Sequence, residues 1–183
     1  ITEKVRKNNF ETVVALIKQK YKNDCGIVYC LSKKETDDYA DQLRYNGIRA
    51  MSYHAGLGDN KRAEVQAKWV ADEVKVVCAT IAFGMGIDKP NVRFVIHAVL
   101  PKSIEGYYQE SGRAGRDLEN ADCILFYSYG DVHRLRKMME LDRPPQNVWE
   151  TNMENLYKMV AFCENRTDCR RALQLNYFGE KFD

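Results

Sequence analysis

The sequence has almost no net charge, because 28 lysines and arginines stand against 26 acidic residues and give a formal charge of +2 at pH 7. Bulk electrostatics therefore do not predict a nucleic-acid-binding protein, and any such surface has to come from local clustering. The sequence also lacks a secretory signal, a transmembrane run, internal repeats and low-complexity segments. We expect no interaction with a membrane.

Two motifs of nucleotide hydrolases are absent as well. No G-x-x-x-x-G-K-[ST] pattern, whose backbone N–H groups and lysine hold phosphates, occurs in the 183 residues. There is also no D-E-x-[DH] run of the kind that holds Mg²⁺ and positions water. The chain by itself is therefore not expected to hold a nucleotide.

The six cysteines do not indicate disulfides. Cys30, Cys78 and Cys123 lie inside or beside apolar runs, where cysteine packs as a small hydrophobic residue. This placement favours an intracellular, reducing compartment.

Apolar runs alternate with helical periodicities along the first 130 residues. Such alternation predicts βαβ crossovers and a mostly parallel sheet with helices on both faces. After residue 130 the pattern is helical only. We therefore predict an α/β domain over residues 1–130 and a small helical appendage over residues 131–183. The expected strands are residues 25–32, 48–54, 74–80, 92–99 and 121–129, and the expected helices between them begin near residues 10, 33 and 59.

Three of the predicted strands end in polar residues, namely Ser32, His54 and Thr80. Ligands of open parallel sheets bind beyond the carboxyl ends of the strands, so these residues mark one candidate rim. Taken alone, a histidine at a strand end is more often structural, and His54 has that alternative.

The segment ATIAFGMGIDKP (residues 79–90) is not a typical connection between a strand and a helix. Gly84 and Gly86 permit close backbone approach to a ligand, and Asp88 and Lys89 add charges before Pro90. A tight turn with a helix cap is the structural alternative.

The stretch YYQESGRAGRD (residues 107–117) places Arg113 and Arg116 three residues apart, beside small residues that leave them uncrowded. Planar guanidinium groups suit bidentate contact with phosphate oxygens. The alternative is a salt-bridged surface turn with Glu110 and Asp117. Arginines that contact phosphate, in a chain without a phosphate-holding loop, predict a partner lobe.

Several stretches together resemble RecQ-family DNA helicases of superfamily 2. TIAFGMGIDKPNVRFVIH and YYQESGRAGRD resemble motifs V and VI of that family, GIVYCLSKKETDDYADQL resembles motif IV, and YHAGL resembles the short motif that follows it. CENRTDCRRALQLNYFGE resembles the first half of the family's zinc-binding subdomain. The likeness covers nearly the whole chain. One departure is Leu118, where the family often has glycine.

The resemblance implies that residues 1–130 are the second RecA-like lobe of an ATP-dependent 3′–5′ DNA helicase and are inactive alone. ATP and Mg²⁺ would be bound mainly by the N-terminal RecA-like lobe of the same polypeptide, and Arg116, with Arg113 beside it, would act as the arginine finger. The positions matching nucleotide contacts are Gln109, Gly86 and Asp88. Those matching the grip on the DNA strand are Ser32, His54, Thr80, Phe83 and Lys89.

The resemblance also implies a Zn²⁺ site in the full-length protein. Cys169 matches its first ligand, and the other three ligands would lie downstream, so residues 131–183 alone are not expected to hold the metal. Likeness to the eukaryotic branch implies a nuclear location. A non-catalytic nucleic-acid-binding or regulatory module derived from a helicase lobe is the alternative, and an RNA helicase fits motif VI but not FGMGIDKP or DCRR.

Overall fold

The computed structural model describes residues 1–4, 9–81, 83 and 88–181. The chain divides into two compact units, one made of Ile1–Val99 and Gln109–Tyr127 and the other of Leu100–Tyr108 and Ser128–Asp183. Residues 100–108, which the sequence pattern places in the first domain, thus group with the helical unit. Within the described ranges, no helix has the length and apolar character needed to cross a membrane.

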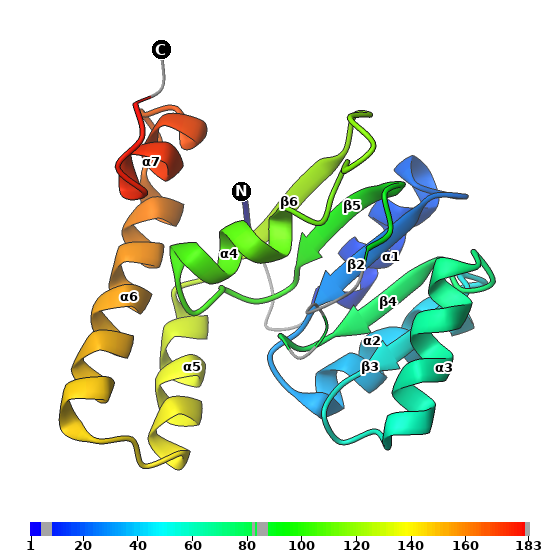
Figure 1. The fold of residues 1–183 in the computed structure, drawn as a ribbon, viewed down its shortest axis with the longest axis horizontal. Coiled ribbons are helices and arrows are strands. Elements are labelled where there is room, and N and C mark those ends of the chain that lie inside the picture. The colour runs from blue at the N-terminus through cyan, green and yellow to red at the C-terminus, as the bar shows by residue number, and fades with distance from the viewer. Residues whose placement is uncertain (5–8, 82, 84–87, 182–183) are drawn as a thin grey trace. The chain divides into compact units, whose positions relative to one another are not determined.

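The first unit is built on a six-stranded sheet in the order β1-β6-β5-β2-β4-β3, and every pair of neighbouring strands is parallel (Figure 1). The predicted parallel α/β architecture is confirmed. The strands are β1 (Thr2–Glu3), β2 (Cys25–Tyr29), β3 (Ala50–Tyr53), β4 (Val76–Ala79), β5 (Val92–His97) and β6 (Asp122–Tyr127). The two-residue strand β1 was not expected from the sequence, and it lies beside the end of β6.

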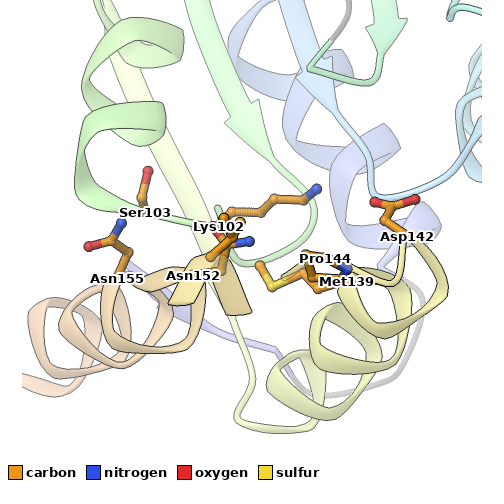
Figure 2. Close-up of a pocket in the computed structure, with 8 residues that line it drawn as sticks. Lys102, Ser103, Met139, Asp142, Pro144, Asn152 and Asn155 are labelled. Atoms are coloured by element: carbon orange, nitrogen blue, oxygen red, sulfur yellow. The ribbon is translucent and has the colours of Figure 1, made fainter. Parts of the chain in front are cut away.

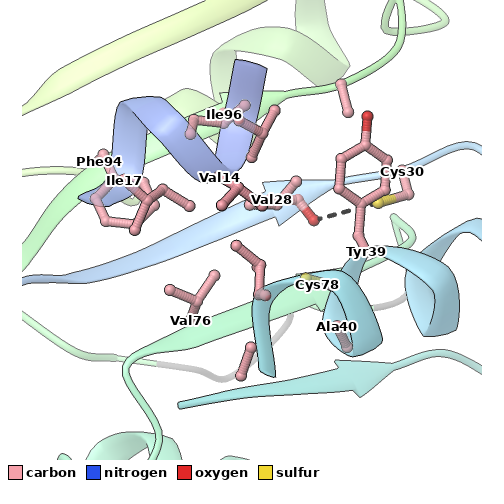
Figure 3. Close-up of a cluster of buried hydrophobic side chains, with 14 of the residues drawn as sticks. Val14, Ile17, Val28, Cys30, Tyr39, Ala40, Val76, Cys78, Phe94 and Ile96 are labelled. Atoms are coloured by element: carbon pink, nitrogen blue, oxygen red, sulfur yellow. Dashed lines mark hydrogen bonds between the residues drawn. The ribbon is translucent and has the colours of Figure 1, made fainter. Parts of the chain in front are cut away.

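Helices cover both faces of this sheet because side chains of a strand point alternately to opposite faces. On β2, Val28 packs in one core cluster with residues of α1 (Phe10–Lys20) and α2 (Lys33–Tyr45), as Figure 3 shows. Its neighbours Ile27 and Tyr29 pack in a second cluster on the other face. There they meet Val65 and Trp69 of α3 (Asp59–Val70).

Close packing at the sheet centre depends on a glycine in β2. A Cβ atom at Gly26 would lie 2.2 Å from ring atoms of Phe94 on the neighbouring strand β5. The Phe94 ring is fully buried and also packs against Tyr21, with ring centroids 4.6 Å apart. Only a residue without a side chain leaves room for this ring.

The helical unit contains α5 (Gly130–Leu141), α6 (Gln146–Glu164), α7 (Arg170–Tyr177) and the first residues of α4 (Ile104–Ser111). The apolar positions that predict α5 and α6 are largely buried, among them Val132, Leu135, Leu156 and Met159. Arg170 donates to the carbonyl oxygens of Phe162 and Cys163 at the end of α6. A guanidinium at this place satisfies carbonyl groups that no longer have a helical partner.

Candidate functional site

The arginine-bearing stretch leaves α4 at Ser111 and turns back along the sheet. The N–H of Gly115 donates to the carbonyl of Val92, the first residue of β5, at 2.9 Å, and the N–H of Leu118 donates to the carbonyl of Gly115 at 3.0 Å. Gly115 has φ +64°, and a Cβ atom there would lie 2.8 Å from the carbonyl oxygen of Glu119. A glycine is therefore required, and the turn is fixed to the sheet through its backbone.

Arg116 carries its guanidinium at the surface. The side chain is 40% exposed, and it donates to Oδ1 of Asp88 at 3.1 Å and to the carbonyl of Gly112 at 3.3 Å. The Asp88 side chain is 81% exposed. An ion pair between two such exposed groups contributes only about 0–1 kcal/mol, so the guanidinium is easily redirected to another anion.

Arg113 is half-buried, whereas Arg116 is exposed, and the charge of Arg113 acts on the hydroxyl group of Tyr29. Burial raises the pKa of the Tyr29 hydroxyl, and the charge and hydrogen bond of Arg113 oppose that increase. The Nε atom of Arg113 is buried without a hydrogen-bond partner among the described residues. Together, Arg113 and Arg116 line a small recess whose other walls are Trp69, Lys89 and Val92.

Three further residues, Asp88, Gln109 and Gly86, were predicted to contact the nucleotide. Asp88 lies against Arg116, as described above. Gln109 is exposed on α4 two residues before its end. Gly86 lies outside the described residues.

The predicted rim of polar residues lies at the carboxyl ends of three strands. Ser32, His54 and Thr80 follow β2, β3 and β4, which lie side by side in the sheet in the order β2-β4-β3. The structure therefore brings these three residues to one edge. This follows from the parallel direction of the strands, which puts all carboxyl ends on the same side.

Ser32 and His54 also have local structural roles. Ser32 caps α2, because its hydroxyl accepts the N–H of Glu35 at 3.2 Å. Nδ1 of His54 accepts the N–H of Gly56 at 3.1 Å, so the ring proton resides on Nε2, which lies 3.3 Å from Oδ1 of Asp37. His54 is buried and shapes the loop after β3, whereas Ala55 and Gly56 are exposed.

Two lysines at this edge were not predicted from the sequence as DNA contacts. Lys33 and Lys34 form the first turn of α2, directly after the Ser32 cap, and both are exposed. The N-terminus of a helix carries a partial positive charge that favours anions, and two ammonium groups add to it. The sequence pattern that could have identified them is Ser32, a residue type that caps helices, followed directly by two lysines.

Phe83 and Lys89, predicted as DNA contacts, are not brought to this rim. Phe83 is 1% exposed and packs against the rings of Tyr53 and Trp69. The Lys89 side chain is 3% exposed, and its ammonium donates to Oδ1 of Asp72 and to the carbonyl of Val70, each at 3.1 Å. Both side chains are part of the interior of the lobe rather than of its surface.

The carboxylate of Asp72 accepts hydrogen bonds from several donors beside the buried Lys89. The hydrogen bond from the Cys25 thiol, followed by that from Lys89, lowers the pKa of its carboxyl group to about 2. Asp72 has φ +62°, a conformation that aspartate and asparagine tolerate better than most residues. The hydrogen bonds between Lys89, Asp72 and Val70 therefore connect the chain before β4 to the chain before β5.

The predicted zinc ligand Cys169 is exposed and lies just before α7. Among the residues that the structure describes, no group of three or more His, Cys, Asp or Glu side chains is arranged to hold a metal ion. A structural zinc site needs about four such ligands. The described residues therefore do not make up a zinc site.

A separate cavity lies in the helical unit between the start of α4, α5 and α6 (Figure 2). It has a volume of about 340 Å³ and is lined by Lys102, Ser103, Met139, Asp142, Pro144, Val148, Asn152 and Asn155. None of the residues predicted from the sequence as functional is among them.

Comparison with known proteins agrees with this architecture. Residues 8–129 match the family model of the helicase conserved C-terminal domain, and residues 129–183 match that of RecQ zinc-binding domains. Among solved structures, a DEAD box protein from the hyperthermophile Methanococcus jannaschii has a TM-score of 0.63 at 27% identity, over 79% of this chain and 39% of its own. The RecA-like fold is thereby confirmed.

Two curated relatives are closely similar in sequence. The RecQ-like DNA helicase BLM of Xenopus laevis is 56% identical over 169 residues, which are 91% of this chain and 12% of the relative. The ATP-dependent helicase SGS1 of Saccharomyces cerevisiae is 45% identical over 181 residues, or 98% of this chain and 12% of the relative. The chain thus spans about an eighth of the length of these relatives, and it belongs to the RecQ helicase family, as part of its C-terminal helicase region.

Proposed function

We propose that this chain is the second motor lobe of an ATP-dependent 3′–5′ DNA helicase. ATP and Mg²⁺ are held mainly by an N-terminal RecA-like lobe of the same polypeptide, and closure of the cleft brings Arg116 and Arg113 to the triphosphate. Support comes above all from Arg116, whose exposed guanidinium projects from a turn fixed to β5 and is paired with an exposed carboxylate. The names of the relatives, which are DNA helicases and ATP-dependent helicases, agree with this function.

Arg116 and Arg113 have different roles in ATP hydrolysis. Arg116 exchanges its weak surface pairing with Asp88 for the γ-phosphate and stabilises the charge that develops during hydrolysis, an effect worth about 10³–10⁵ in rate in nucleotide hydrolases. Arg113 lies beside Arg116 in the same recess and adds a second positive charge. Gln109, Gly86 and Asp88 complete the contacts to the nucleotide from this lobe.

The rim after β2, β3 and β4 grips the DNA strand through its phosphates. Ser32 and Thr80 offer hydroxyl groups, His54 shapes the exposed loop after β3, and Lys33 with Lys34 adds positive charge. Such contacts position a strand without reading its sequence. Phe83 and Lys89 support this rim from inside the lobe.

Two further proposals rest on the family alone. Cys169 is one ligand of a Zn²⁺ ion whose remaining ligands belong to the full-length protein. The full-length protein acts on DNA in the nucleus.

The decisive experiment replaces Arg116 by alanine in the full-length protein and measures DNA-stimulated ATP hydrolysis. We expect the turnover rate to fall by about 10³-fold or more while ATP binding changes little, because the nucleotide is held mainly by the other lobe. Arg136→Ala is a matched control, since Arg136 is also exposed and pairs with Glu140 at 3.1 Å. It should leave turnover unchanged.

The isolated chain should show no DNA-stimulated ATPase activity. Robust turnover by the isolated chain, or by Arg116→Ala, contradicts the proposal. A full-length protein that binds DNA but never hydrolyses ATP would instead identify the non-catalytic module. Activation by single-stranded RNA in preference to DNA would identify an RNA helicase.

A further inference from the structure

A buried polar chain crosses the interior of the first unit between the rim and the arginine turn. Its central member is Tyr29, the last residue of β2, which is 2% exposed. The Tyr29 hydroxyl donates to the carbonyl oxygen of Phe83 at 3.1 Å. Because a carbonyl oxygen only accepts, the proton of the hydroxyl is committed to Phe83, and its oxygen remains free to accept from Arg113.

The Phe83 end of this chain reaches the rim directly. The N–H of Phe83 donates to the carbonyl of Thr80 at 3.0 Å, and the N–H of Thr80 donates to the carbonyl of Tyr53 at 3.3 Å. Hydrogen bonds therefore connect Thr80 to Phe83 and Phe83 to Tyr29. The positive charge of Arg113 in turn acts on the Tyr29 hydroxyl. A shift of Thr80 moves the carbonyl that orients the tyrosine hydroxyl.

His97 and Glu110 connect the tyrosine ring to the segment that carries Arg113, so that a shift of the ring is transmitted to that segment. His97 stacks on it with ring centroids 5.2 Å apart and an interplanar angle of 21°. Nε2 of His97 lies 2.8 Å from Oε2 of Glu110, three residues before Arg113 on the same segment. The ring and the arginine segment are thus held by one set of contacts, in a closely packed interior where side chains have few alternative positions.

We propose that Tyr29 is a positioning residue that couples the grip on DNA at Thr80 to the placement of Arg113 in the nucleotide cleft. The inference rests on the proposed function, since it needs DNA at the rim and ATP at the arginines. It adds a residue that touches neither ligand and acts through its hydroxyl alone.

The test is Tyr29→Phe in the full-length protein, which removes the hydroxyl and keeps the ring. We expect kcat for ATP hydrolysis with saturating oligo-dT to fall by about five- to tenfold, in line with the loss of one buried hydrogen bond, the one to the carbonyl of Phe83. The KM for ATP should stay within about twofold, and the ratio of DNA-stimulated to basal rate should fall. A purely structural role would lower the melting temperature without this split.

Tyr39→Phe is the matched control. Tyr39 is also buried, at 4% exposure, but in the core cluster on the other face of the sheet (Figure 3). It should lose a similar amount of stability and keep its kcat. Action through Arg113 is tested by a double-mutant cycle, in which Tyr29→Phe should have little further effect on kcat in an Arg113→Lys background.

A second measurement keeps the hydroxyl and does not depend on the folding of a variant. 3-Fluorotyrosine at position 29 should show a ¹⁹F resonance that moves when oligo-dT binds. The inference is overturned if Tyr29→Phe leaves kcat and DNA stimulation unchanged, if it acts equally in the Arg113→Lys background, or if the resonance stays fixed while DNA binds. In each of these cases the loss of turnover in Arg116→Ala would still stand, so the two failures are distinguishable.

Discussion

Replacing Lys89 by methionine tests whether this lysine stabilises the lobe or contacts DNA. The Lys89 side chain is 3% exposed, its ammonium bonds Asp72 and the carbonyl of Val70 at 3.1 Å, and it lies 5.6 Å from the centre of the Trp69 ring. Methionine is unbranched and flexible and fills much the same space. The change therefore removes the charge and the hydrogen bonds and leaves most of the packing.

The expected loss of stability follows from the exposure of the two partners. Removing one member of a fully buried ion pair costs about 3–5 kcal/mol. The Asp72 side chain is 43% exposed, so water solvates its carboxylate once the ammonium is gone. We expect the free energy of unfolding to fall by about 2 kcal/mol, which lowers the melting temperature of a chain of this size by about 4–8 °C.

The assay combines thermal melting with the salt dependence of DNA binding. A lysine that contacts phosphate contributes about 0.7 to the slope of log K against log salt for single-stranded DNA. Lys89→Met should lower the melting temperature and leave this slope unchanged. Lys33→Met, at the exposed first turn of α2, should do the reverse.

The opposite pair of results would show that Lys89 contacts DNA. If Lys89→Met melts within about 1 °C of the unchanged protein and has a lower salt slope, the ammonium contacts phosphate in solution. The interior contacts with Asp72 and Val70 would then not describe the state that binds DNA.

Three further predictions concern stability of the isolated chain, measured by denaturant or thermal unfolding. Gly26→Ala places a Cβ atom 2.2 Å from the buried Phe94 ring and should cost about 3 kcal/mol or prevent folding; unfolding unchanged from the native sequence would contradict the packing. Leu118 is 97% exposed with φ +68°, so Leu118→Gly should stabilise by about 1 kcal/mol while Leu118→Ala, equally strained, should not. The pKa of Asp72 is lowered to about 2, first by the hydrogen bond from Cys25, so its stabilisation is full above its ordinary pKa of 3.8 and is lost as the pH falls toward 2. Asp72→Asn should remove about 1 kcal/mol of that acid-dependent stability after screening by solvent; an acid profile identical to that of the native sequence would contradict it.

Much of the fold was predictable from local patterns. The helix from Phe10 and the strands β2 and β4 follow from periodicities of apolar residues, which reflect burial and do not depend on distant parts of the chain. The two-residue strand β1 carries no such pattern. It forms because the backbone of Thr2 and Glu3 meets the end of β6, which only the assembled sheet provides.

The candidate site was predictable to a smaller extent. Ser32, His54 and Thr80 were identified because each follows a strand, and parallel strands bring their ends to one edge. The resemblance to the helicase family placed Lys89 with them. The structure puts Lys89 against Asp72 instead, because the chain returns to the start of β5 before it reaches this lysine.

The types of the main elements, their alternation and the position of the arginine turn could be predicted from the sequence, because they depend on neighbours within a few residues. Which charged groups face solvent and which are neutralised in the interior depends on the assembled fold. Tyr29, His97 and Glu110 are far apart along the chain and come into contact only in the folded lobe, whose strands are not in chain order. The exposure of Arg116 and the burial of Lys89 have the same origin, since the free energy of a charge depends on the partners and the water that the assembled fold leaves around it.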